Sequence, residues 1–155
     1  MNTPNPTCST PGSTPPAPGA ATATLTFLAM DPPYENGRST TLLRLVDAAL
    51  RKGANVNVFA YEGAVNLAFA KQIPHANAIH GCDVAQEDHP TTREWLAALQ
   101  AAAAEKNLKL DWINCGLCVD ERGAQESIPG VRRGSPADFW KFVESSANTL
   151  VISTR

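Results

Sequence analysis

The 155-residue chain is long enough for one domain that buries most of its unfolded surface, and its 43% apolar and 18% charged residues are ordinary for a globular protein. A formal net charge of −2 gives no long-range attraction to nucleic acid or anionic lipid, so we expect neither as a partner. No apolar run approaches the ~20 residues that are needed to span a bilayer, which argues against a membrane protein.

The beginning of the chain is proline-rich and uncharged. Residues 1–21 hold six of the twelve prolines, and no charged residue occurs before Asp31. Such a segment buries too little apolar surface to offset its ordering entropy, so we predict a disordered tail over 1–21, with a partner-docking segment as the alternative. It has neither the basic start nor the apolar core of a secretory signal, which favours a cytoplasmic location.

The next elements are a strand, a helix and a second strand. Residues 24–30 alternate like a strand, which stops at 31–33 because proline removes a donor and restricts the preceding residue. Gly53 suits the C′ position of the helix that follows. Residues 56–61 form the second strand, and a short helical piece is expected over 64–71. The apolar stripe of the first helix is predicted to consist of Leu42, Leu45, Val46, Ala49 and Leu50.

The middle of the chain is less regular until a second long helix begins. Residues 73–89 are rich in His, Asn, Gly and Asp and are expected to be irregular. Thr91 and Glu94 have the spacing of a capping box at the start of a helix. Residues 108–114 form a third strand that runs directly into Cys115 and a short helix. The stripe of the long helix is predicted to consist of Trp95, Leu96, Leu99, Ala102 and Ala103.

The last part of the chain completes an alternating pattern. Residues 125–134 are expected to form a loop. Ser135, Pro136 and Asp138 suit the N-cap, N1 and N3 positions of a final helix, whose apolar face includes Phe139, Phe142 and Val143. Residues 149–153 form a closing strand. Strands that alternate with helices predict an α/β fold, with a mostly parallel sheet and helices on both of its faces.

The carboxyl ends of parallel strands share one edge of the sheet, where ligands bind. Asp31, Glu62 and Cys115 all lie at predicted strand ends. Backbone N–H groups at the start of the helix after Cys115 favour an anion and lower the pKa of a thiol, so we expect this sulfur to be accessible and ionised. A buried, inert cysteine is the alternative.

Three other side chains near Cys115 are candidates for the site. Cys118 follows one helical turn later and could either resolve a persulfide into a disulfide or pack the helix against the sheet. Arg122 could stabilise a thiolate or persulfide anion, although a solvated cluster with its acidic neighbours is the more ordinary interpretation. Asp31 and Glu62 could act as an acid and a base, or simply cap helices.

A metal-binding protein is the main alternative. His80, Cys82, Cys115 and Cys118 supply imidazole and thiolate ligands that could converge on Zn²⁺ or Fe. A thioredoxin-like dithiol oxidoreductase fits less well, because the Cys-x-x-Cys lies late in the chain and no following strand opens with a suitable proline. Exchange of sulfane sulfur needs only a thiolate and a leaving thiolate, so we expect no cofactor for it.

The stretch from Leu110 to Gly123 resembles the cysteine signature of the DsrE/DsrF family, which includes TusD. In that family a strand ends in cysteine, and an Arg-Gly pair, here Arg122-Gly123, closes the short helix. Residues 31–34, 56–65 and 150–152 are also similar to family segments, and the likeness extends over residues 23–154. Cys118, the 73–89 segment and the tail depart from the pattern.

The resemblance carries expectations about fold and function. It implies a DsrE/DsrF-like three-layer α/β/α sandwich over residues 22–155, assembled into homotrimers or homohexamers. It also implies a persulfide on Cys115 and, as partners, the sulfur donor and acceptor proteins of a cytoplasmic relay. We therefore expect a sulfur carrier or sulfurtransferase.

Overall fold

A computed structural model describes residues 22–74, 83–87 and 90–154 of the chain. The tail predicted over 1–21 lies outside these residues, as do His80 and Cys82 and most of the segment predicted to be irregular. Within the described part, no helix is long and apolar enough to cross a membrane.

The centre of the domain is a five-stranded sheet in the order β4-β3-β2-β1-β5. All four strand pairings are parallel, and β1 is in register with β2 from Thr24 opposite Asn55 to Ala29 opposite Ala60. The predicted parallel α/β sheet is therefore confirmed. The strands are β1 (Thr24–Ala29), β2 (Asn55–Ala60), β3 (Leu110–Cys115), β4 (Val131–Gly134) and β5 (Asn148–Ile152).

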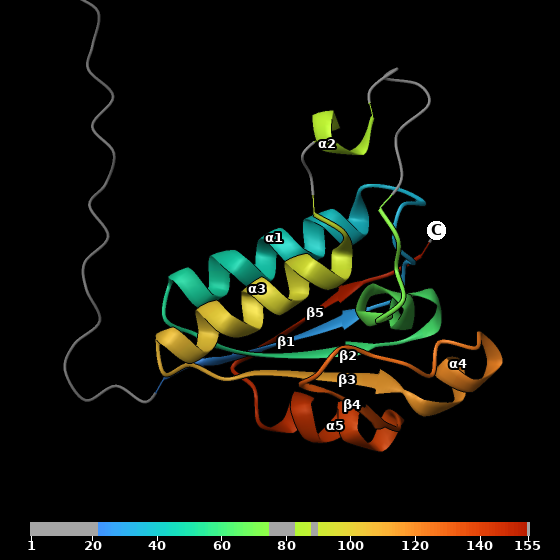
Figure 1. The fold of residues 1–155 in the computed structure, drawn as a ribbon. Helices are drawn as coiled ribbons and strands as arrows, with labels where there is room; N and C mark the ends of the chain where they lie inside the picture. The colour runs from blue at the N-terminus through green and yellow to red at the C-terminus, as the bar shows by residue number, and fades with distance from the viewer. Residues whose placement is uncertain (1–21, 75–82, 88–89, 155) are drawn as a thin grey trace, which may run out of the picture.

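Helices cover both faces of this sheet (Figure 1). The long helices α1 and α3 lie side by side on one face, α5 lies on the other, and α4 lies beyond the carboxyl end of β3. The three-layer α/β/α sandwich is confirmed. The helices are α1 (Arg38–Arg51), the 3₁₀ helix η1 (Glu62–Ala68), α2 (Val84–Glu87), α3 (Thr92–Glu105), α4 (Gly116–Glu121) and α5 (Pro136–Glu144).

The sheet divides the apolar side chains into two clusters because successive residues of a strand point to opposite faces. The larger cluster, which includes Val58 and Trp112, packs under α1 and α3. The smaller cluster contains Phe59 and Ile113, the strand neighbours of those residues, together with Phe142 of α5. This smaller cluster matters for function, since it also contains both cysteines of the predicted site.

Local sequence signals place most helix ends correctly. The Thr91 hydroxyl and the Glu94 carboxylate form the predicted capping box at α3, and the Asp138 carboxylate accepts a hydrogen bond of 2.9 Å from the Ser135 N–H at α5. Gly53 follows α1 with a φ of +82°. The predicted stripe of α1 is wrong at Leu45, which is 36% exposed, whereas Leu43 is buried in its place.

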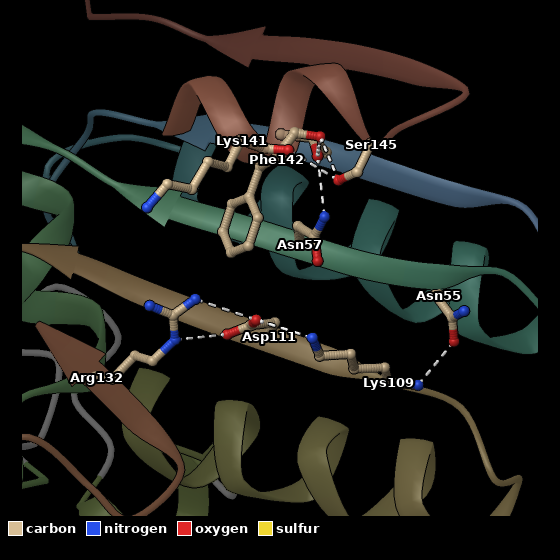
Figure 2. Close-up of polar contacts among 9 residues, drawn as sticks. Asn55, Asn57, Lys109, Asp111, Arg132, Lys141, Phe142 and Ser145 are labelled. Atoms are coloured by element: carbon tan, nitrogen blue, oxygen red, sulfur yellow. Dashed lines mark hydrogen bonds and ion pairs between the residues drawn. The ribbon is translucent and has the colours of Figure 1, made fainter. Parts of the chain in front are cut away.

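Two predicted elements need correction. Residues 125–134 are not loop throughout, because Val131–Gly134 pairs with β3 as the edge strand β4. This strand has no apolar alternation, and tertiary contacts hold it: Figure 2 shows the Arg132 guanidinium bound to the Asp111 carboxylate of β3, with N···O distances of 3.1 and 3.2 Å. The helical piece predicted over 64–71 is the 3₁₀ helix η1, which begins two residues earlier, at Glu62.

Candidate functional site

Cys115 is the last residue of β3 and the N-cap of the six-residue helix α4, as the sequence predicts. Its neighbour Asn114 fixes this junction, because its buried amide donates to the carbonyl oxygen of Val65 and to the hydroxyl of Ser127, both at 3.2 Å. From β4, the Arg133 guanidinium donates to the Gly116 carbonyl at 3.1 Å. The hydrogen bonds of Asn114 and the contact from Arg133 thus fix the position of the end of β3.

The expectation of an accessible Cys115 sulfur is wrong for this conformation. Its side chain is only 2% exposed and belongs to the smaller apolar cluster. The reason is the alternation along β3, since Ile113 and Cys115 both point to the face that α5 covers with Phe142. Access to the sulfur therefore requires a movement of the side chains around it.

Cys118 lies against Cys115 and is itself 4% exposed. Its sulfur accepts a hydrogen bond from the Glu62 backbone N–H at 3.3 Å. Burial and a hydrogen bond with Cys115 raise the pKa of the Cys118 thiol to about 11, against the opposing effect of the Glu62 N–H. At neutral pH Cys118 therefore keeps its proton and acts as a hydrogen-bond partner of the Cys115 sulfur.

Arg122 and Glu62 form an ion pair at the same edge of the sheet. Arg122 also contacts the Glu121 carboxylate at 3.2 Å, so its charge is neutralised by two acids. No contact links Arg122 to Cys115 in the described parts of the chain. Glu62 connects this ion pair to the cysteine pair, because its side chain binds Arg122 while its backbone N–H donates to the Cys118 sulfur.

Asp31 lies at the end of β1 and is buried, with an ion-pair distance of 3.4 Å to Arg38. It lines a cavity of about 390 Å³. Glu62 and Arg122 line a neighbouring cavity of about 570 Å³. The structure thus gathers Asp31, Glu62 and Arg122 around open space at the carboxyl edge, whereas Cys115 and Cys118 lie under cover behind Glu62.

Residues 23–152 match the family model described as the DsrE/DsrF-like family. The chain belongs to the DsrE/DsrF-like family. Members of this family generally take part in sulfur relays. The fold agrees, since the chain is similar to the crystal structure of the ychN protein from E. coli, with a TM-score of 0.62 and 18% identity over 83% of this chain and 98% of that one. A comparison with curated proteins finds no match.

The metal alternative gains no support from the described part of this DsrE/DsrF-like domain. No group of three or more His, Cys, Asp and Glu side chains there could hold a metal ion. Cys115 and Cys118 are packed among apolar side chains. The other two proposed ligands, His80 and Cys82, lie outside the described residues.

Tyr61 is a site residue of the DsrE/DsrF-like domain that the sequence analysis missed. It is partly exposed, packs on the cluster that holds both cysteines, and stacks on Phe59 with ring centroids 6.4 Å apart. In the alkaline range where phenols and thiols ionise, negative charge on Cys118 and then on Glu62 raises the pKa of the Tyr61 phenol, with smaller effects of burial and of Cys115. Its position directly after β2 is the signal that could have identified it.

Arg133 is the second missed residue. Its guanidinium forms a two-point ion pair with Asp120 of α4, with N···O distances of 2.7 and 2.9 Å. The structure gives it a bracing role, because it joins the end of β4 to the short helix that begins at Cys115.

Proposed function

We propose that Cys115 carries sulfane sulfur as a persulfide and passes it to an acceptor thiol. The Cys115 thiolate attacks the outer sulfur of a donor persulfide. A new bond forms between that sulfur and Cys115, while the donor S–S bond breaks and its electron pair leaves with the donor thiolate. Attack of an acceptor thiolate on the same outer sulfur then returns Cys115 to its starting state, so no oxidant or reductant is consumed.

The observation that supports this proposal best is the position of Cys115. It is the only cysteine at a strand-to-helix junction in the described part of a DsrE/DsrF-like domain, and a second thiol lies against it. Because Cys118 is protonated at neutral pH, it can donate a hydrogen bond to an anionic sulfur on Cys115. Such a donor stabilises the anion in surroundings that are otherwise apolar.

The high pKa of Cys118 also affects how long a persulfide would survive. A Cys118 thiolate could attack the inner sulfur, form a disulfide with Cys115 and release hydrosulfide. With a pKa of about 11, Cys118 is very largely protonated at pH 7, whereas the thiolate is the attacking species. We infer that Cys118 protects the persulfide at neutral pH and resolves it only slowly.

Burial of Cys115 makes the transfer step conditional on local opening. Tyr61 and Phe139 are partly exposed aromatic side chains that pack, together with Phe69, on the cluster around the sulfur. Rotation of either side chain is a smaller change than unfolding of a strand, and aromatic side chains at a surface move readily. We infer that a docking partner displaces one of them and reaches the sulfur.

Exposed apolar side chains support contacts with other proteins near the site. Leu117 of α4 is 72% exposed and Trp140 of α5 is 63% exposed. Such side chains favour protein interfaces, which here would serve donor and acceptor proteins of a cytoplasmic relay or other copies of the chain in a homotrimer or homohexamer. Sedimentation at several concentrations tests the assembly, and a monomer throughout would contradict that part.

The experiment that tests the function is loading with inorganic polysulfide, followed by intact mass spectrometry and cyanolysis. Wild-type protein should gain one sulfur atom that cyanide removes. Cys115→Ser and Cys115→Ala should gain none, and Cys118→Ser should still load. A Cys115 variant that folds normally and still carries sulfane sulfur would overturn the proposal.

A further inference from the structure

The two cavities at the carboxyl edge of the sheet adjoin each other, since Glu35 and Thr154 line both of them. We call the combined space the edge cleft. The volumes of about 390 and 570 Å³ lie in the range of small-molecule sites. The cleft is lined by three acidic and two basic side chains, which are Asp31, Glu35, Glu62, Arg38 and Arg122.

The charges in the edge cleft are arranged as two ion pairs with one acid left over. Arg38 pairs with Asp31, and Arg122 pairs with Glu62. Glu35 is exposed on the wall between the two cavities, and within the described residues it has no ion pair or hydrogen bond. An unpaired carboxylate attracts an ammonium group, while the partly exposed Arg38, whose ion pair with Asp31 is long at 3.4 Å, can bind a carboxylate.

The edge cleft is directly connected to the cysteine pair through one residue. Glu62 lines the larger cavity with its side chain, and its backbone N–H donates to the Cys118 sulfur. Next to it, Gly63 lets the loop after β1 approach, because a Cβ at this position would lie 2.8 Å from Cδ of Pro32. Glu62 is thus a wall residue of the larger cavity and a direct hydrogen-bond partner of the Cys118 sulfur.

We propose that the edge cleft binds a small zwitterionic persulfide of the amino-acid class, which serves as a sulfur donor. Glu35 holds the ammonium group, Arg38 holds the carboxylate, and the persulfide points toward Glu62 and the cysteine pair. This inference rests on the proposed function and names the substrate class for it. The transfer is the exchange described above, in which the leaving group is the free amino-acid thiolate and no further reactant is needed.

Recognition of the donor can be tested without any sulfur transfer. S-methyl-L-cysteine carries both charged groups and no reactive thiol, so we expect calorimetry to detect its binding to the wild type and to Cys115→Ser. S-methylcysteamine lacks the carboxylate and 3-(methylthio)propionate lacks the ammonium group, and each should bind at least about tenfold more weakly, as expected for the loss of one charge-assisted contact.

Variants of two exposed glutamates provide the matched comparison. Glu35→Gln should weaken binding of S-methyl-L-cysteine by about tenfold or more. Glu144→Gln, which removes an exposed acid at the end of α5, should leave it unchanged. Absence of binding, equal binding to the Glu35→Gln variant or equal binding of all three compounds would overturn the inference.

A second measurement separates this inference from the proposed function. Loading of Cys115 by cysteine persulfide at low concentration should be about tenfold slower in Glu35→Gln, whereas loading by inorganic polysulfide should be unchanged, because polysulfide lacks both charged groups. Binding without any loading would refute the function and leave the cleft site intact. Loading at equal rates in both proteins would refute the cleft site and leave the function intact.

Discussion

The backbone N–H of Glu62 donates a hydrogen bond to the sulfur of Cys118 over an N···S distance of 3.3 Å. This contact joins the segment after β2 to the helix after β3, at the shared edge of the sheet. Glu62 makes it from a left-handed conformation with a φ of 50°, which residues other than glycine seldom adopt and which occurs often at functional sites. The cysteine pair and the edge cleft therefore share one constrained residue.

The stability of the domain should decrease in alkaline solution because of Cys118. The folded protein holds the Cys118 proton up to a pKa of about 11, whereas an unfolded cysteine loses it near 9.0. The protonated Cys118 thiol therefore contributes fully to the free energy of unfolding below pH 9. This contribution, roughly 2–3 kcal/mol, is lost as the pH rises through 11. Urea unfolding at pH 8 and pH 10.5 measures it. Cys118→Ala should be less sensitive to this change than the wild type, and identical pH dependence would contradict the prediction.

Tyr61 should control access to Cys115. Tyr61→Ala removes a ring that packs on the cluster containing both sulfurs. We therefore expect Cys115 to react with a disulfide reagent at least about tenfold faster than in the wild type. Such a change corresponds to a decrease of about 1.4 kcal/mol or more in the free energy of local opening. Tyr61→Phe keeps the ring and should react nearly as slowly as the wild type. Trp140→Ala, which removes an exposed aromatic side chain from α5, serves as the control. If all three variants reacted alike, Tyr61 would not be the cover.

Gly63 should not tolerate a side chain. A Cβ at this position would lie 2.8 Å from Cδ and 2.9 Å from Cβ of Pro32, so Gly63→Ala should lower the free energy of unfolding by about 1–3 kcal/mol. Gly37→Ala is the matched control, because a Cβ at Gly37 meets nothing within 4 Å. Chemical denaturation of both variants decides the matter. Equal stability would mean that the loop after β1 can move away at no cost.

The start of α5 should weaken in strong acid. Hydrogen bonds from Ser135, first from its backbone and then from its side chain, together with Lys141, lower the pKa of Asp138 to about 2. The folded carboxylate is thus ionised where the unfolded one begins to bind a proton, so this stabilisation is present above pH 4 and is lost as the pH falls toward 2. Thermal unfolding of the wild type and Asp138→Asn should converge over this interval. A constant difference between them would speak against the capping role.

Much of the fold could be predicted from the sequence because its signals are local. The caps at Thr91 and Ser135 depend on residues three positions apart, and Gly53 depends on its own φ. The edge strand β4 could not be found in this way, because the Arg132 contact with Asp111 that holds it spans 21 residues of sequence. Local patterns contain no information about such a partner.

The candidate site could likewise be predicted only in part from local sequence patterns. The position of Cys115 at the end of a strand follows from the sequence, but its burial depends on the apolar cluster that residues from several elements form around it, which only the packed structure brings about. The pairing of Arg122 with Glu62 likewise needs the order of the strands, which alternation alone does not reveal. Tyr61 directly follows β2, which marks it as a candidate, but its packing on the cluster that holds both cysteines depends on tertiary contacts.

The helices cover the two faces of the sheet unequally. Two helices of 14 residues cover one face, while α5, the helix on the other face, has nine residues and Phe142 as its one buried side chain. Amide hydrogens of α5 should accordingly exchange with solvent far sooner than those of α1 and α3. If Cys115 carries sulfur as proposed, local opening of the layer that contains α5 would expose this residue while the larger core under α1 and α3 stays intact.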